Sequence, residues 1–140
     1  MKPEVILDTG PLIAFLNPRD RYHRWAREQW SRTSPPFLTC EAVVAEACFL
    51  AHRLATGAQG AVISLIERGV LDVSFRLGDE AGRVRRMMNK YHDVPMSLAD
   101  ACIVRMSQQH PGSVVLTLDS DFRIYRRSGR QPVPVRMPER

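Results

Sequence analysis

The sequence has little lysine, little cysteine and no long apolar run. Only Lys2 and Lys90 are lysines among the 20 basic residues, so arginine carries almost all of the positive charge. The three cysteines form no C-x-x-C pair and lie among apolar neighbours, which argues against a disulfide framework or a cysteine zinc site and favours a reduced, cytoplasmic protein. The apolar run at residues 5–7 is too short for a signal peptide, and no segment approaches the length of a membrane span, so no membrane partner is expected.

What remains is an ordinary globular composition. The 140 residues are 44% hydrophobic and 25% charged, and this length is typical of one domain, which we expect to occupy residues 1–140. The formal net charge is +5. Guanidinium groups suit phosphate recognition, so nucleic acid is the working hypothesis for a partner, although an arginine bias can equally reflect genome composition.

Short apolar runs alternate with segments of helical periodicity. The strands are expected at residues 5–7, 37–39, 70–75 and 114–118, with an edge strand at 132–135. The helices are expected at residues 12–16, 22–32, 41–55, 58–68, 77–91 and 98–109, with a helical turn after Asp121. Strands joined by helical crossovers predict an α/β fold with a mostly parallel central sheet and helices on both faces.

Acidic residues fall where an open parallel sheet binds its ligands, outside the carboxyl ends of the strands. Asp8 follows the first strand directly, and Asp119 follows the strand at 114–118. Asp100 lies in the first turn of a helix whose preceding linker should return to the same edge. Glu46 lies between Val43 and Leu50 on a helix with a broad apolar stripe, on the side expected to face the protein. A buried carboxylate there is unfavourable unless a partner meets it.

Each acid also has a purely structural interpretation. Asp8 is placed to cap a helix, and Asp100 fits a capping-box-like pattern that begins at Ser97. Glu46 could pair with Arg53, and the acids after the last strand could form its turn. Independent structural roles give no reason for all four acids to meet at one sheet edge, so convergence there favours a shared chemical role.

Converging carboxylates require positive charge. Two of them about 4 Å apart repel by roughly 4 kcal/mol at an effective dielectric near 20. Oxygen ligands without a histidine at suitable spacing favour Mg²⁺ or Mn²⁺ over zinc, and such a cation can activate water and stabilise charge on a phosphodiester. Setting the four acids aside leaves 11 acidic residues against 20 basic ones, a surface of about +9 that suits a polyanion.

The same segments resemble the PIN-domain family, and within it the VapC-type toxins of toxin–antitoxin pairs. The matching motifs lie at residues 5–10, 41–46, 97–101 and 116–122, in the family's order along nearly the whole chain. The resemblance implies a doubly wound parallel sheet and a Mg²⁺- or Mn²⁺-dependent endoribonuclease that hydrolyses RNA phosphodiester bonds. The alternative is a non-catalytic PIN-like domain that binds RNA or protein.

The resemblance also implies roles for the four acids. Asp8, Glu46, Asp100 and Asp119 match the family's acidic quartet. Asp8, Asp100 and Asp119 would be the direct metal ligands, and Glu46 would complete the metal site or orient the attacking water. No protein nucleophile is needed in this scheme.

Supporting residues are implied in the same way. Thr117 matches a hydroxyl near the last acid, and Asp121 matches an acid that assists there or only orders the turn. Gly10 stands where many relatives carry serine, so hydroxyl assistance at that position would come from Thr9. The resemblance also implies three partners: an RNA substrate, a cognate VapB-like antitoxin whose tail fills the active groove, and a second copy of the chain in a homodimer formed through helices.

The remaining candidates carry weaker signals. Trp25 or Trp30 could stack on a base, although core packing is the simpler interpretation. The four histidines are scattered and are interpreted as structural or surface groups. Seven arginines could contact phosphate or could be ordinary solvated side chains: Arg83, Arg85, Arg86, Arg123, Arg126, Arg127 and Arg130.

Two other α/β families with clustered acids fit poorly. A haloacid-dehalogenase-type phosphatase requires a second aspartate two residues after the first, and position 10 is glycine. A response-regulator receiver domain requires a lysine after a late strand, and no lysine follows Lys90.

Overall fold

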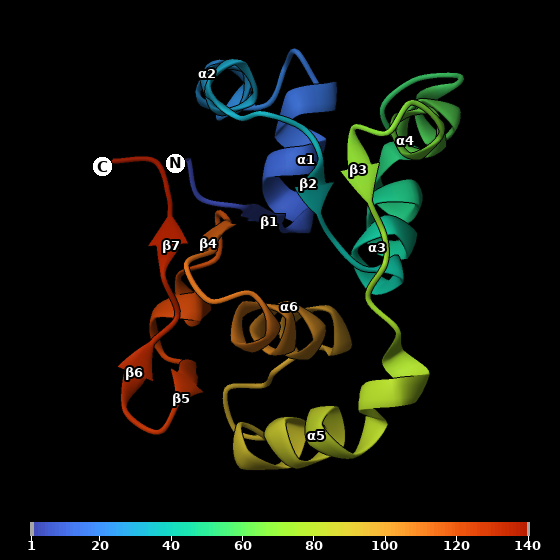
Figure 1. Cartoon of the computed structure of the whole chain (residues 1–140). Helices are drawn as coiled ribbons and strands as arrows, with labels where there is room; N and C mark the ends of the chain where they lie inside the picture. Colours follow the sequence, from blue (N-terminus) through green and yellow to red (C-terminus); the bar gives the residue numbers. More distant parts are fainter. Residues whose placement is uncertain (1, 140) are drawn as a thin grey trace.

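The computed structural model describes residues 2–139, which form an α/β fold around a five-stranded parallel sheet (Figure 1). The strand order is β3-β2-β1-β4-β7, and every pairing in this sheet is parallel. The strands are β1 (Val5–Leu7), β2 (Phe37–Leu38), β3 (Leu71–Asp72), β4 (Val114–Leu116) and β7 (Val135–Arg136). The predicted fold class is confirmed.

Strand β1 lies at the centre of the sheet because it is apolar on both faces. Ile6 pairs with Leu38 of β2 on one side and with Val115 of β4 on the other. Side chains alternate across a strand, so Ile6 enters one buried cluster while Val5 and Leu7 enter a second cluster on the opposite face. Such two-sided burial explains the uninterrupted apolar run.

In the part of the chain that the structure describes, six α-helices connect the strands and cover both faces of the sheet (Figure 1). They are α1 (Thr9–Leu16), α2 (His23–Arg32), α3 (Glu41–Ala51), α4 (Ala58–Glu67), α5 (Leu77–Lys90) and α6 (Leu98–Gln109). Within residues 2–139, no helix is long and apolar enough to cross a membrane.

Several elements are shorter than the sequence predicts. Helix α3 ends at Ala51 rather than at residue 55, because residues 52–54 form turns that lead to Gly57, whose φ of +87° favours glycine. Strand β4 ends at Leu116, and Thr117, the residue that follows it, donates its hydroxyl to Asp8. The strand expected at residues 70–75 pairs only over Leu71–Asp72.

The C-terminal region contains an antiparallel hairpin that the sequence did not indicate. Its strands are β5 (Arg126–Ser128) and β6 (Gln131–Pro132), joined through Gly129 with a φ of +57°. The edge strand expected at residues 132–135 is therefore divided between this hairpin and β7. The expected helical turn is the 3₁₀ helix η1 (Ser120–Arg123), which begins just before Asp121.

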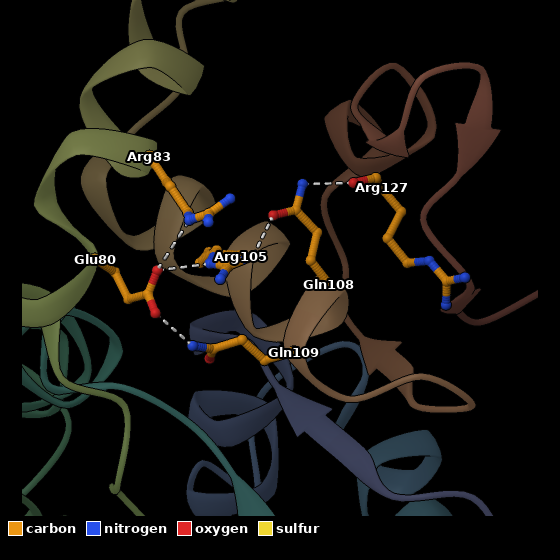
Figure 2. A network of polar contacts seen from close by, with 6 residues as sticks. All are labelled: Glu80, Arg83, Arg105, Gln108, Gln109 and Arg127. Atoms are coloured by element: carbon orange, nitrogen blue, oxygen red, sulfur yellow. Dashed lines mark hydrogen bonds and ion pairs between the residues drawn. The ribbon is translucent and has the colours of Figure 1, made fainter.

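A polar network fastens the hairpin and α5 to α6 (Figure 2). The Glu80 carboxylate accepts hydrogen bonds from Arg105 at 2.7 Å and from Gln109 at 2.8 Å, and the Gln108 amide donates to the backbone carbonyl of Arg127. The hydrogen bond from Arg105 holds the pKa of Glu80 below its ordinary value. Helix α6 thus holds α5 through Glu80 and the hairpin through Arg127.

Candidate active site

A pocket of about 400 Å³ opens at the carboxyl ends of β1 and β4, beside α3 and α6. Leu7 pairs with Leu116, so the residues that follow these two strands emerge at the same edge of the sheet. The lining residues come from four separate segments: Asp8, Thr9, Gly10, Glu46, Asp100, Leu118, Asp119 and Ser120. All four acids singled out in the sequence therefore lie around one pocket.

Asp8 is buried at the junction of β1 and α1. Its Oδ1 accepts the Thr9 backbone N–H at 2.8 Å, so Asp8 does cap α1. Its Oδ2 accepts the Thr117 hydroxyl at 2.6 Å. Burial raises the pKa of Asp8 to about 6, and the charges of Asp100 and Asp119 add to the rise, against the two hydrogen bonds. The capping residue is therefore also an acid whose charged form is destabilised.

Asp100 lies in the first turn of α6, and its carboxylate is held from outside that helix. Ser97 is the N-cap, and its hydroxyl accepts the Asp100 backbone N–H at 3.0 Å, as the capping pattern predicts. Asp100 Oδ2, however, accepts the hydroxyl of Tyr125 at 2.8 Å. Burial raises the pKa of Asp100, while hydrogen bonds from Tyr125 and Ser97 oppose the rise and Asp119 adds to it.

Asp119 is half-buried and begins the turn that forms η1. Its Oδ1 accepts the Asp121 backbone N–H at 2.9 Å, and its own N–H donates to Thr117 Oγ1 at 3.0 Å. Thr117 therefore connects Asp8 to Asp119 through a single hydroxyl. Asp121 contributes its backbone to this turn, and its side chain is not among the residues that line the pocket.

The sequence-based expectation for Glu46 is wrong in one respect. Glu46 lines the pocket, but its side chain is exposed rather than turned into the protein. The buried face of α3 carries Val43 and Ala47, and Arg53 lies over the ring of Phe49 instead of pairing with Glu46. Glu46 therefore has no burial cost to offset, and it stands at the rim.

Thr9 and Gly10 shape the floor of the pocket. Thr9 is buried, and its Oγ1 has no hydrogen-bond partner within residues 2–139. A Cβ at Gly10 would come within 3.2 Å of the Leu118 side chain, closer than ordinary packing. Glycine at this position thus leaves room for Leu118 at the pocket wall.

The donor set fits a hard divalent cation, although the acids are not gathered tightly. In the described part of the chain, no three His, Cys, Asp or Glu side chains are arranged closely enough to hold a metal ion as they stand. No basic side chain in that part forms an ion pair with the pocket acids either. Carboxylate and hydroxyl oxygens are ligands that Mg²⁺ and Mn²⁺ prefer. Burial is the main cause of the raised pKa values of Asp8 and Asp100, and the neighbouring carboxylates add to the rise, so the charged forms of both acids are disfavoured.

Comparison with known proteins decides the family. The sequence model of the PIN domain family matches residues 5–127 of this chain. The chain belongs to the PIN domain family. Ribonuclease VapC26 of Mycobacterium tuberculosis is 27% identical over 116 residues, which cover 82% of this chain and 86% of that protein.

A solved structure supports the PIN fold. The crystal structure of Mycobacterium tuberculosis VapC20, described as a sarcin-ricin loop cleaving toxin, superposes with a TM-score of 0.73. The match covers 84% of this chain and 92% of that one, at 21% sequence identity. At this identity the likeness concerns the fold alone.

Tyr125 and Ser120 belong to the surroundings of this PIN-domain pocket and were not foreseen. Ser120 follows Asp119 directly and lines the pocket. Tyr125 is separated from Asp100 by 25 residues and lies outside any helical pattern, so nothing in the sequence linked the two. The one signal in the sequence was its place just after the motif that contains Asp119.

The two tryptophans pack against the core. The Trp30 ring stacks on Phe15 with ring centroids 4.0 Å apart, and it contacts the Phe37 ring at a tilt with centroids 4.2 Å apart. Trp25 is partly buried against the same cluster. Among the arginines, Arg126 donates to two nearby backbone carbonyls, and Arg83 faces Glu80 at 3.9 Å.

Proposed function

We propose that this PIN-domain protein is a Mg²⁺- or Mn²⁺-dependent endoribonuclease that hydrolyses RNA phosphodiester bonds. The observation that carries the proposal is the convergence of four carboxylates, from four segments far apart in the sequence, on one pocket of about 400 Å³. The name of the relative Ribonuclease VapC26 supports the same chemistry. A basic surface outside the pocket would hold the RNA backbone.

The side chains divide the work by position. Asp8, Asp100 and Asp119 would hold the cation, while Glu46 at the rim would orient the attacking water. Thr117 keeps Asp8 and the Asp119 turn in place through its single hydroxyl. When bound, a divalent cation supplies Lewis-acid stabilisation of the charge that develops on the phosphate.

Cleavage of labelled RNA tests the proposal. The wild-type protein should cut RNA when Mn²⁺ or Mg²⁺ is added and should stop when EDTA is added. Asp8→Asn should reduce the rate at least 100-fold, because it removes a charged ligand while leaving the fold intact. Asp93→Asn, which removes the same charge from an exposed position, is the matched control. If Asp8→Asn cuts as fast as the control, the assignment of the site fails.

We further propose that the protein is the toxin of a VapBC-type pair and acts in the cytoplasm, where RNA is available. Its partners would be a cognate VapB-like antitoxin and a second copy of this chain. Both named relatives are VapC proteins, and one is described as a toxin. Induced expression of the wild type, but not of Asp8→Asn, should arrest growth. Co-expression of a short upstream reading frame should restore growth, and sedimentation of the purified protein should give twice the monomer mass.

A non-catalytic PIN-like module that binds RNA or protein is the second candidate, and the exposed Glu46 and the open arrangement of the acids favour it. Thermal melting separates the two. A cation at 100 times its Kd stabilises a folded protein by about 2.7 kcal/mol, so the nuclease should melt higher with Mn²⁺. A module without a metal site should show no shift and no cleavage.

A further inference from the structure

Tyr125 is a fully buried tyrosine whose hydroxyl ends at the acid pocket. Its side chain has no exposed surface, and its hydroxyl donates to Asp100 Oδ2 at 2.8 Å. A phenol is protonated at neutral pH, so the group is a hydrogen-bond donor there.

The ring of Tyr125 is fixed by its neighbours. The Phe122 ring packs edge-on against it with ring centroids 5.3 Å apart. The ring of Tyr91, the residue after α5, also packs edge-on, with centroids 5.1 Å apart. The Tyr91 hydroxyl accepts the backbone N–H of Arg126, the residue after Tyr125. The two edge-on contacts hold the ring, whereas the Tyr91 hydroxyl anchors only the backbone of the next residue, so ring packing sets where the phenol oxygen of Tyr125 lies.

Asp100 receives this donor in addition to the contacts of its own helix. Ser97 fixes the backbone of Asp100, but a side-chain torsion still separates that backbone from the carboxylate. Tyr125 is a hydroxyl donor from outside α6 that fixes the carboxylate itself. We propose that Tyr125 is a positioning residue that sets the orientation of the Asp100 carboxylate for the divalent cation. The inference rests on the proposed function and deepens it.

The experiment compares Tyr125→Phe with Tyr91→Phe. Tyr125→Phe keeps the ring and removes only the donor to Asp100. Tyr91→Phe also removes one hydroxyl from the same aromatic cluster, but it leaves a backbone N–H unpaired and does not touch Asp100. The melting temperature is followed as Mn²⁺ is added, and RNA cleavage is measured over the same Mn²⁺ range.

Tyr125→Phe should raise the Mn²⁺ concentration at half-effect about 10-fold, in keeping with the loss of a hydrogen bond to a metal-binding carboxylate. Its cleavage rate should return to within about 3-fold of wild type at saturating Mn²⁺. Tyr91→Phe should leave the Mn²⁺ midpoint unchanged. In an Asp100→Asn background, Tyr125→Phe should have no further effect on Mn²⁺ binding, because the carboxylate through which Tyr125 acts has been removed.

A Mn²⁺ midpoint for Tyr125→Phe within 2-fold of wild type overturns the inference. Equal shifts in Tyr125→Phe and Tyr91→Phe also overturn it, since they would reflect a loosened core. In both cases, cleavage and a Mn²⁺-dependent melting shift in the wild type would leave the proposed nuclease intact. A wild type that neither binds Mn²⁺ nor cuts RNA refutes both proposals.

Discussion

Removing the charge of Asp8 should stabilise the metal-free protein while it abolishes activity. The pKa of Asp8 is raised from 3.8 to about 6, mainly by burial. At neutral pH this difference corresponds to about 3 kcal/mol of destabilisation, since each pKa unit equals 1.36 kcal/mol. An asparagine side chain would keep an oxygen for the Thr9 N–H and turn its amide toward Thr117 Oγ1, while the Thr117 hydroxyl would lose its acceptor, so Asp8→Asn should recover about 1.5–2.5 kcal/mol.

The pH dependence has a definite sign. Because the folded pKa lies above the unfolded value, the native state binds more protons than the unfolded state between about pH 4 and pH 6. The contribution of Asp8 is therefore most favourable below pH 4 and is lost as the pH rises through 6. In EDTA, Asp8→Asn should melt about 5–10 °C above wild type at pH 8, and the two proteins should melt together near pH 4.

Thermal denaturation in EDTA between pH 4 and pH 8 provides the assay, with Asp93→Asn as a control for the loss of a surface charge. That control should track the wild type at every pH. Adding Mn²⁺ should raise the melting temperature of the wild type and not that of Asp8→Asn. An Asp8→Asn protein that melts at or below wild type at pH 8 would refute the view that Asp8 is an uncompensated buried charge.

Two further predictions concern the hydrogen-bond framework and the basic surface. Thr117→Val should slow RNA cleavage at least 10-fold and lower stability by about 1–3 kcal/mol, because Asp8 loses a donor and the Asp119 N–H loses an acceptor; a cleavage rate equal to wild type would contradict this role. The affinity of Asp8→Asn for single-stranded RNA should fall at least 10-fold between 50 mM and 200 mM salt, as three phosphate contacts require, and titration by fluorescence anisotropy measures it. An unchanged affinity would exclude the arginines as phosphate contacts.

The parts of the fold that follow from local pattern could be predicted from the sequence. Residues 5–7 are apolar throughout, which is the pattern of a strand buried on both faces, and the acid directly after them had to emerge at the ligand-binding edge. Helix α6 was predicted over its full length, because Ser97 supplies an N-cap and Pro111 stops the helix pattern.

The orientation of Glu46 could not be predicted, because the apolar stripe of α3 is broad. Val43, Ala47 and Ala51 form its buried face, while Glu46 and Leu50, one turn apart, both lie on the exposed side. Because Leu50 is apolar, the sequence pattern predicted that it is buried, and Glu46, which lies on the same side of the helix, was predicted to be buried with it. Only the packing of α3 against α1 and α4 decides between these two rotations of the helix.

The contact between Tyr125 and Asp100 was also beyond local pattern, and it explains how the fold tolerates its acids. Burying a carboxylate without a partner destabilises the folded state. Within residues 2–139, no basic side chain forms an ion pair with the acids of this pocket. Instead, Thr117 donates to Asp8 and Tyr125 donates to Asp100, so each buried acid has one oxygen held by a neutral hydroxyl. A neutral donor fixes a carboxylate without cancelling its charge. The pocket therefore keeps the negative potential that would attract the proposed divalent cation, while the two hydroxyl donors reduce the free-energy cost of burying its acids.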